Sequence, residues 1–131
     1  MIYGTGDWAT MDAFALPDEP KFVCAGKQAG IIAIAYEDGR IETWDLAAKT
    51  LLRRFEGHNA ALTAFRFDVS GERLISGHAD GTIRVWDAEH ASTERVIVGH
   101  VGPVYALSAD PFGATFASAG EDRLIRVWNA R

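Results

Sequence analysis

The segment Ile83-Arg-Val-Trp-Asp87 decides the fold, because close variants of it occur at two other places in the chain. Ile41-Glu-Thr-Trp-Asp45 precedes it and Ile125-Arg-Val-Trp-Asn129 follows it, so that the tryptophan recurs at intervals of 42 residues. A fixed period of about 40–45 residues indicates several copies of one small structural unit. The chain is therefore expected to be a repeat protein, with each copy ending in a Trp-Asp or Trp-Asn pair.

Further landmarks keep the same register. They are Asp38, Asp80 and Asp122, the dipeptides Gly57-His58 and Gly99-His100, the pair Ser76 and Ser118, and the pair Gly71 and Gly113. Chance does not place so many matches at one spacing. The three copies are therefore equivalent units, and a role argued for a residue in one copy applies to its counterparts.

Each copy reads as short strands separated by turns, with no helical period of convincing length. In the second copy the four strands, a to d, are expected at 62–67, 72–76, 82–86 and 94–98. Asp80-Gly81 joins b to c, and this dipeptide favours a tight hairpin because both residues tolerate positive φ. Asp38-Gly39 repeats it in the first copy. In the third copy Arg123 replaces the glycine, so the same turn is made with a costlier residue.

The other copies follow by register. Their strands are expected at 20–25, 31–36, 40–45 and 50–55 in the first copy, and at 104–109, 114–118 and 124–129 in the third. The run 8–14 falls in register with strand d. The chain is thus phased d, abcd, abcd, abc. We expect one unit over 1–131, with a leading outer strand at 8–14 and copies at 15–56, 57–98 and 99–131, the last without its outer strand.

These landmarks resemble the WD-repeat β-propeller family, and the resemblance covers nearly all of residues 15–131. It implies an all-β fold in which each copy is a blade of four antiparallel strands. It also implies that a buried tetrad of polar residues ties each blade together, with an indole, a hydroxyl, an imidazole and a carboxylate bonded in sequence. The matching residues are His58, Ser76, Asp80 and Trp86 in the second copy, and His100, Ser118, Asp122 and Trp128 in the third.

The first copy departs from this pattern. Leu16 stands where the histidine belongs and Ile34 where the serine belongs, which leaves a partial tetrad of Asp38 and Trp44. We expect this blade to depend on apolar packing and to be the least rigid of the three.

Composition limits the classes of function. The 131 residues are 48% hydrophobic, which is enough for a packed core. Thirteen Lys and Arg against 18 Asp and Glu give a net charge of −5, which argues against binding to nucleic acid or to anionic membranes. Cys24 is the lone cysteine, so no internal disulfide forms. Without a signal peptide or a membrane-length apolar run, a cytoplasmic or nuclear protein is expected.

Catalytic and metal sites are disfavoured. A Ser, His and Asp in one network suggest a catalytic triad, but a triad needs an exposed nucleophile and an oxyanion hole, and this constellation occurs twice in equivalent positions. The four histidines, His58, His78, His90 and His100, are far apart in sequence, and no cysteine pair accompanies them. Gly4-Thr-Gly6 is too short for a phosphate-binding loop. We therefore expect no cofactor, no metal and no enzymatic activity.

The leading interpretation is a protein–protein interaction scaffold, because a propeller presents a rigid face of loop tips. Tyr105 is the strongest single candidate, since aromatic residues are enriched in binding hot spots; packing between blades is the alternative role for it. The acidic candidates favour a partner with basic residues. The candidate contact residues lie beside the b–c turns or after each Gly-His dipeptide, and they are Glu37, Asn59, Ala79, Val101, Tyr105 and Glu121.

A second interpretation concerns assembly. Three blades do not readily close a ring, since propellers typically have about four to eight. Two copies would supply six blades, with the 8–14 strand of each copy pairing with the last blade of the other, which removes both exposed sheet edges. A fragment of a larger propeller is the competing explanation, and the sequence favours neither.

Overall fold

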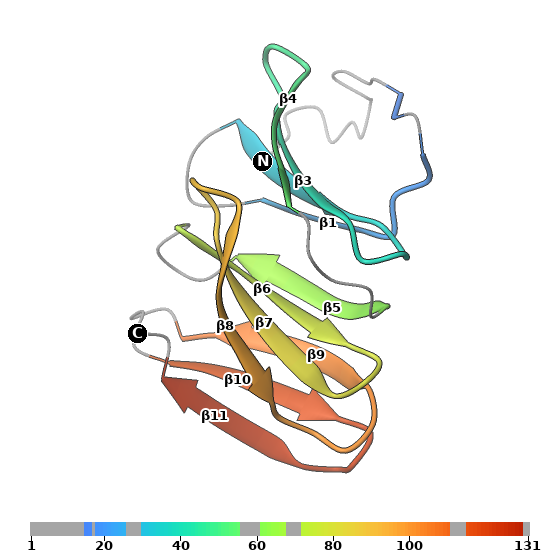
Figure 1. Ribbon diagram of the computed structural model, residues 1–131, viewed down its shortest axis with the longest axis vertical. Helices are drawn as coiled ribbons and strands as arrows, with labels where there is room; N and C mark the ends of the chain where they lie inside the picture. The colour runs from blue at the N-terminus through green and yellow to red at the C-terminus, as the bar shows by residue number, and fades with distance from the viewer. Residues whose placement is uncertain are drawn as a thin grey trace, which may run out of the picture.

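The computed structural model describes residues 15–16, 18–25, 30–55, 61–67, 72–110 and 115–129. Within these residues the chain forms eleven strands and no helix, arranged in three antiparallel sheets that follow one another along the long axis of the molecule (Figure 1). The all-β fold and the stacked blades are thereby confirmed. The described strands do not form a closed ring.

The strands pair in chain order within each sheet. The first sheet contains β1 (Phe22–Ala25), β2 (Ile31–Ala35), β3 (Ile41–Asp45) and β4 (Thr50–Phe55). The second contains β5 (Leu62–Phe67), β6 (Arg73–His78), β7 (Thr82–Asp87) and β8 (Ser92–Val98). The third contains β9 (Val104–Ala109), β10 (Thr115–Gly120) and β11 (Ile125–Asn129).

All eleven strands overlap the segments that the repeat register predicts for them. The third sheet has three strands within the described part of the chain, as the phasing predicts. The predicted leading strand at 8–14 lies outside the described residues, so its pairing stays a prediction.

The turns between the second and third strands of each sheet adopt the predicted left-handed backbone. Gly39 has a φ of 97° and Gly81 a φ of 87°. Arg123, which replaces the glycine in the third sheet, has a φ of 68°. An L-residue with a side chain is strained in this region, because its Cβ approaches the following carbonyl oxygen. The prediction that this turn is made with a costlier residue is confirmed.

Replacing Arg123 with glycine should therefore stabilise the chain. We expect the free energy of unfolding to rise by about 1 kcal/mol, because the strain of a left-handed residue with a side chain is relieved. Equilibrium urea unfolding would measure the change. Arg126→Gly, in the adjoining strand β11, is the control and should destabilise instead. A loss of stability in Arg123→Gly would contradict this explanation.

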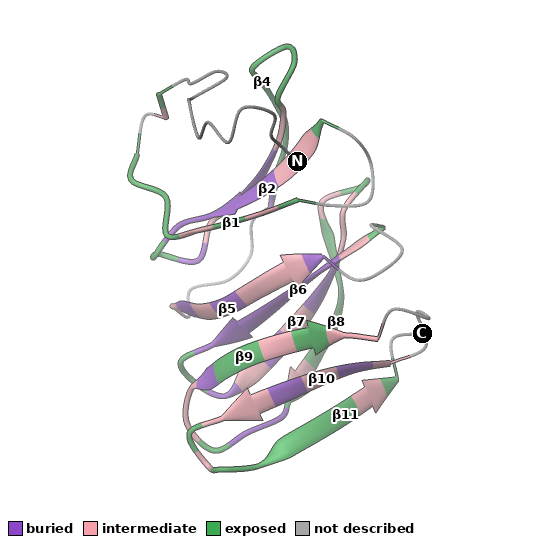
Figure 2. Cartoon of the chain, turned by 180° about the vertical axis from the view of Figure 1, so that it is seen from behind, coloured by how far each residue is buried: buried purple, intermediate pink, exposed green. Residues whose placement is uncertain are grey.

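Two apolar clusters hold the sheets together. Between the first and second sheets, Ile41 and Phe55 pack with Leu74 and Trp86. Between the second and third sheets the buried cluster has five members, Ile75, Ile83, Val85, Val104 and Phe116. The second sheet thus packs one face against the first sheet and the other against the third, and the middle strands of the first two sheets are the most buried (Figure 2).

The outer face of the third sheet has no such cover among the described residues. Ile83 and Val85 in the second sheet are 0% and 6% exposed. Their equivalents in the third sheet, Ile125 and Val127, are 76% and 67% exposed, and most of β11 appears exposed in Figure 2. The same apolar face is therefore buried in the second sheet and exposed to solvent in the third.

Candidate functional site

The third sheet contains an unbroken chain of polar contacts. The Trp128 indole Nε1–H donates to Ser118 Oγ over 2.8 Å, and that hydroxyl lies 2.7 Å from His100 Nε2. The other ring nitrogen, Nδ1, lies 2.9 Å from Asp122 Oδ1. An indole only donates and a carboxylate only accepts, so Ser118 donates to Nε2 and Nδ1–H donates to Asp122. The four residues named from the sequence lie together in the expected order.

Asp122 extends this chain to the backbone. Its Oδ2 accepts from the Val101 amide and its Oδ1 from the Leu124 amide, both over 3.1 Å. The hydrogen bond from His100 lowers the pKa of Asp122, with smaller contributions from the two amides. The carboxylate therefore stays ionised at neutral pH and joins the loop before β9 to the turn between β10 and β11.

The geometry does not support catalysis by this chain of residues. Ser118 is 1% exposed, and its oxygen already accepts the Trp128 indole N–H. A nucleophilic serine must meet a substrate carbonyl beside an oxyanion hole. The distances resemble a triad, but the arrangement satisfies buried polar groups that would each cost about 1–3 kcal/mol if unpaired.

In the second sheet the ring partner of the serine is His78. The Trp86 indole donates to Ser76 Oγ over 2.9 Å, and Ser76 Oγ lies 2.8 Å from His78 Nε2. His78 is fully buried. The predicted partner, His58, lies outside the described residues. Asp80, the fourth predicted member, accepts from the amide and the hydroxyl of Thr82.

A difference between two repeats explains the role of His78. Its equivalent in the third sheet is Gly120, and a Cβ added there would lie 2.8 Å from His100 Nδ1. The imidazole of His100 thus needs a residue without a side chain at that position. In the second sheet the position carries a histidine, which itself binds the serine. Sequence reasoning considered His78 only as a metal ligand, although the His-to-Gly difference between equivalent positions was the available signal.

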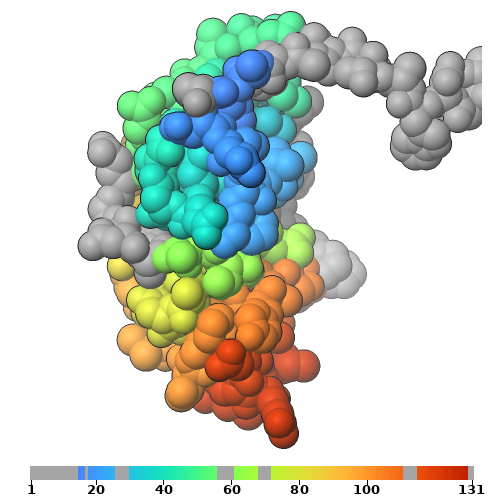
Figure 3. Space-filling model, turned by 90° about the vertical axis from the view of Figure 1, so that its right-hand side faces the viewer, coloured from blue at the N-terminus to red at the C-terminus, as the bar shows by residue number. Residues whose placement is uncertain are grey.

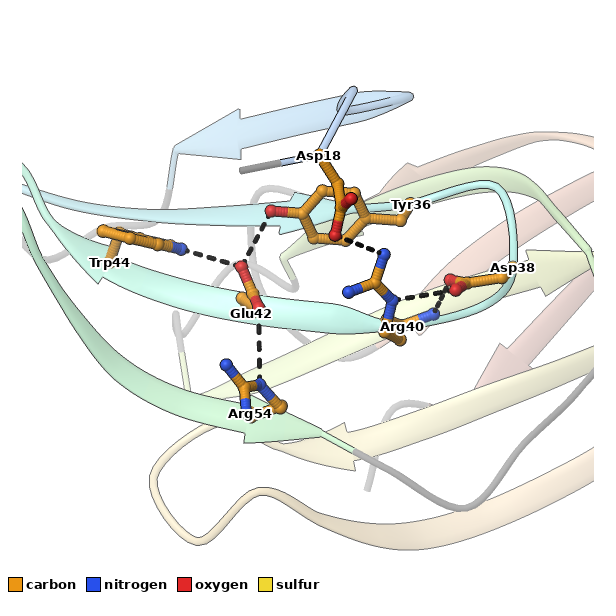
Figure 4. Close-up of polar contacts among 7 residues, drawn as sticks. All are labelled: Asp18, Tyr36, Asp38, Arg40, Glu42, Trp44 and Arg54. Atoms are coloured by element: carbon orange, nitrogen blue, oxygen red, sulfur yellow. Dashed lines mark hydrogen bonds and ion pairs between the residues drawn. The ribbon is translucent and has the colours of Figure 1, made fainter. Parts of the chain in front are cut away.

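The first sheet packs through apolar residues such as Ile41 and Phe55, as expected, and it also has a polar cluster that was not predicted. Glu42, which is 4% exposed, accepts from the Tyr36 hydroxyl over 2.8 Å and from the Trp44 indole over 3.1 Å (Figure 4). Arg54 Nε lies 3.4 Å from its other oxygen. In the first sheet a carboxylate on β3 thus accepts the hydrogen bond from the indole N–H. In the second and third sheets a serine hydroxyl on the second strand accepts it. Ile34, at the serine position, is 2% exposed, and Leu16 is half-buried.

Asp38, the other member of the partial tetrad, bonds with Arg40 and not with Trp44. It accepts from the Arg40 amide and pairs with the Arg40 guanidinium at 2.8 Å, and Asp18 pairs with the same guanidinium at 3.0 Å (Figure 4). The Arg40 guanidinium also lies 4.5 Å from the centre of the Tyr36 ring. These exposed pairs order the β2–β3 turn, although surface ion pairs each contribute at most about 1 kcal/mol.

Removing the Glu42 carboxylate should weaken the first sheet. In Glu42→Ala the buried Tyr36 hydroxyl and the Trp44 indole lose their acceptor, so we expect a loss of about 3 kcal/mol in the free energy of unfolding. Denaturant titration followed by tryptophan fluorescence would measure it. Arg40→Ala removes only exposed ion pairs at the adjacent turn and should cost much less. Equal losses in the two variants would contradict the role given to Glu42.

The aspartate of the Trp-Asp pair closes the turn that follows it. Asp45 Oδ1 accepts the amides of Ala47 and Ala48, and Asp87 Oδ1 accepts those of Glu89 and His90. These bonds close the turns into β4 and β8, which reach positive φ at Lys49 and Ala91. Sequence reasoning used the Trp-Asp pair only as a landmark and missed this function.

The predicted partner-contacting residues gather at one end of the molecule. This end is formed by the β2–β3, β6–β7 and β10–β11 turns and by the loop before β9, and it faces the viewer in Figure 3. We call it the turn-end surface. Asn59, the sixth candidate, lies outside the described residues. The other five are all exposed, and they are Glu37, Ala79, Val101, Tyr105 and Glu121.

Tyr105 is an accessible member of the turn-end surface. Its side chain is 58% exposed, and its hydroxyl donates to Glu121 Oε2 over 3.0 Å. Glu121 also lies against Gly102, and its amide donates to the Pro103 carbonyl. Because its side chain is mostly exposed, Tyr105 does not have the alternative role of packing between neighbouring sheets. An aromatic ring and a carboxylate are instead held side by side in solvent.

The remaining candidate ligands do not come together. In the described part of the chain, no three His, Cys, Asp or Glu side chains are placed to hold a metal ion. His90 Nδ1 lies 3.0 Å from Asp87 Oδ2 at an exposed turn. Burial raises the pKa of the Cys24 thiol to about 11, which keeps it protonated and unreactive. No helix among the described residues is long and apolar enough to cross a membrane.

Comparison with known proteins agrees with the sheet geometry. The sequence profile of the family described as "WD domain, G-beta repeat" matches residues 49–87 and 91–129, together more than half of the chain. Each match begins at an outer strand, β4 or β8, and continues through the first three strands of the next sheet. One sequence repeat thus contributes to two neighbouring blades. The stretch containing Leu16 and Ile34 lies outside both matches.

A curated relative is similar over part of the chain. It is the U3 small nucleolar RNA-associated protein 12 of Saccharomyces cerevisiae, 48% identical over 63 residues, which is 48% of this chain and 7% of the relative. The chain thus spans only a small part of that protein. The repeat profile, the three sheets and the buried indole–hydroxyl–imidazole contacts all agree: the chain belongs to the WD40-repeat family.

Proposed function

We propose that the chain is a protein–protein interaction scaffold whose turn-end surface binds a partner segment rich in lysine and arginine. The observation that carries this proposal is the pair formed by Tyr105 and Glu121, exposed and bonded to each other at 3.0 Å. A tyrosine face attracts cations and a neighbouring carboxylate pairs with them. Glu37 adds a second exposed carboxylate at the same end.

The relative supports a more specific partner class. Its name associates that protein with a small nucleolar RNA. Direct contact with RNA requires a basic surface, whereas this chain carries a net charge of −5. Protein components of RNA–protein particles are themselves rich in basic residues. The proposed partner is therefore a basic protein of such a particle and not its RNA, and the proposed place of action is the nucleolus.

A peptide titration tests the turn-end surface. A fluorescently labelled peptide of lysines and glycines would be titrated with the wild type and with Tyr105→Ala, and binding followed by anisotropy. Loss of a hot-spot aromatic costs more than about 1.4 kcal/mol, so affinity should fall at least tenfold. Val96→Ala, at a half-exposed position on the outer strand β8, is the control and should bind as the wild type does. Unchanged affinity in Tyr105→Ala would reject the proposal.

A second candidate function is self-association into a larger ring. The observation that favours it is the open face of the third sheet, where Ile125 and Val127 are exposed although their equivalents are buried. A second copy could cover this face by presenting the side of its first sheet that bears Ile32 and Trp44, both only partly buried. Such head-to-tail packing repeats the two contacts already present within the chain.

Solution mass decides between one copy and two. Light scattering should give about 28 kDa, twice the 14.3 kDa of one chain, and Val127→Asp should return the mass to that of one chain. Val96→Asp, on the outer strand β8, is the control and should leave the mass at twice that of one chain. A wild-type chain that stays monomeric at high concentration would exclude self-association.

A further inference from the structure

A groove between the first and second sheets lies at the end opposite the turn-end surface. Its volume is about 580 Å³, within the range of about 300–1,000 Å³ of pockets that hold ligands. Its apolar lining comes from Ile31, Leu52, Phe67 and Ala88. The groove is thus formed jointly by β2 and β4 of one sheet and by β5 and the β7–β8 turn of the next.

Two equivalent bulges supply residues to this groove. In β4, Arg53 pairs with Thr43 and Leu51 with Trp44, so that Leu52 is the extra residue. In β8, Arg95 pairs with Val85 and Thr93 with Trp86, so that Glu94 is the extra residue. A bulge changes the direction in which a side chain points. Both extra residues line the groove, one apolar and one acidic.

The charges around the groove are unequal. Four carboxylates, those of Glu72, Asp87, Glu89 and Glu94, face two guanidinium groups, those of Arg53 and Arg73. Both guanidinium groups are already bonded. Arg53 Nε donates to the Glu89 carbonyl over 2.8 Å and so spans the two sheets, and Arg73 Nε lies 3.2 Å from Glu94 Oε1. The lining keeps a net charge of −2 around an apolar floor.

We propose that this groove binds a short extended peptide segment of a partner protein, with a leucine-sized side chain on Leu52 and Ala88 and an adjacent lysine or arginine facing Glu89. The apolar side chain of the peptide would cover Leu52, which is 38% exposed, and its cation would pair with the excess of carboxylates in the groove. This site is separate from the turn-end surface in position and in its requirement for an apolar side chain. Specific peptide recognition commonly combines a pocket for one side chain with charge complementarity.

The test compares three labelled peptides by fluorescence anisotropy. The first has one leucine flanked by lysines, the second has serine in place of the leucine, and the third has glutamates in place of the lysines. The first should bind at least tenfold more tightly than either of the others. Equal affinity for the leucine and serine peptides would overturn the proposal, because the groove would then contribute nothing beyond charge.

Variants locate the binding on the protein. Leu52→Ser and Glu89→Lys should each weaken binding of the leucine peptide at least fivefold. Leu46→Ser is the matched control, because Leu46 and Leu52 are both 38% exposed and only Leu52 lines the groove. Leu46→Ser should bind within twofold of the wild type; equal weakening by Leu46→Ser and Leu52→Ser would overturn the proposal. Circular dichroism would verify that each variant is folded.

Discussion

Trp86→Ala should lower the free energy of unfolding by about 3–5 kcal/mol, the largest single loss that we expect in this chain. Trp86 is 1% exposed and meets Phe55 edge-on, with ring centres 5.8 Å apart. Its indole also donates to Ser76. Truncation would leave a cavity between the first and second sheets and remove the donor to a buried hydroxyl. Since whole domains are stable by only about 5–15 kcal/mol, a large fraction of the variant could be unfolded.

Two variants separate the causes of this loss. Trp86→Phe keeps most of the ring and removes the N–H, so it should cost about 1–2 kcal/mol. Trp44→Ala truncates the equivalent tryptophan of the first sheet, which is only half-buried, and should cost less than Trp86→Ala. Guanidinium unfolding monitored by circular dichroism measures all three. If Trp44→Ala were as damaging as Trp86→Ala, the burial argument would fail.

Gly81→Ala should also be strongly destabilising, with a loss of about 3 kcal/mol in the free energy of unfolding. Gly81 has a φ of 87°, where a side chain costs about 1–2 kcal/mol. A Cβ there would also lie 2.0 Å from the His100 carbonyl oxygen, a distance that forces the backbone to move. Moving it would break the bonds from the Gly99 and His100 amides to the Gly81 carbonyl. The turn of one blade would thus separate from the loop that leads to the next.

Gly30→Ala is the matched control for this prediction. Gly30 has a φ of 79°, but a Cβ added there would have no atom within 4 Å. It carries the backbone strain without the clash, and should cost only about 1–2 kcal/mol. Thermal unfolding of both variants measures the difference. Equal midpoints would show that contact between Gly81 and His100 does not hold the blades together.

Much of the fold was predictable because most positions occur in three equivalent copies of the repeat. The strands and the left-handed turn at Arg123 recur at equivalent positions, so comparison within the chain identified them, whereas the tetrad that contains Ser118 was implied by the resemblance to the WD-repeat family. Burial could also be inferred in this way: an apolar residue at the position of Ile83 is expected to face another sheet. What recurs in a sequence is visible without coordinates.

Features that occur once were not predictable by the same comparison. Glu42 and Tyr36 replace the serine of the other blades, but a carboxylate in a strand reads as solvated until its neighbours are known. In the sequence His78 is an isolated histidine, and its hydrogen bond with Ser76 is seen only in the folded structure. The groove depends on two bulges, and a bulge changes side-chain direction without a distinctive sequence. Glu42 and His78 were thus missed because their partners differ between repeats, whereas the turn-closing role of Asp45 and Asp87 recurs and was missed as well.

A charge-swap titration tests whether the turn-end surface binds a basic partner. Glu121→Lys would be titrated by anisotropy with the lysine–glycine peptide and with its glutamate–glycine counterpart, beside Ala47→Lys/Ala48→Lys, which adds the same charge at the opposite end. We expect Glu121→Lys to lose at least tenfold in affinity for the lysine peptide and to gain affinity for the glutamate peptide, while the double variant stays close to the wild type. The same modest change in both variants would show that net charge alone attracts the peptide, and would contradict a specific site at Tyr105 and Glu121.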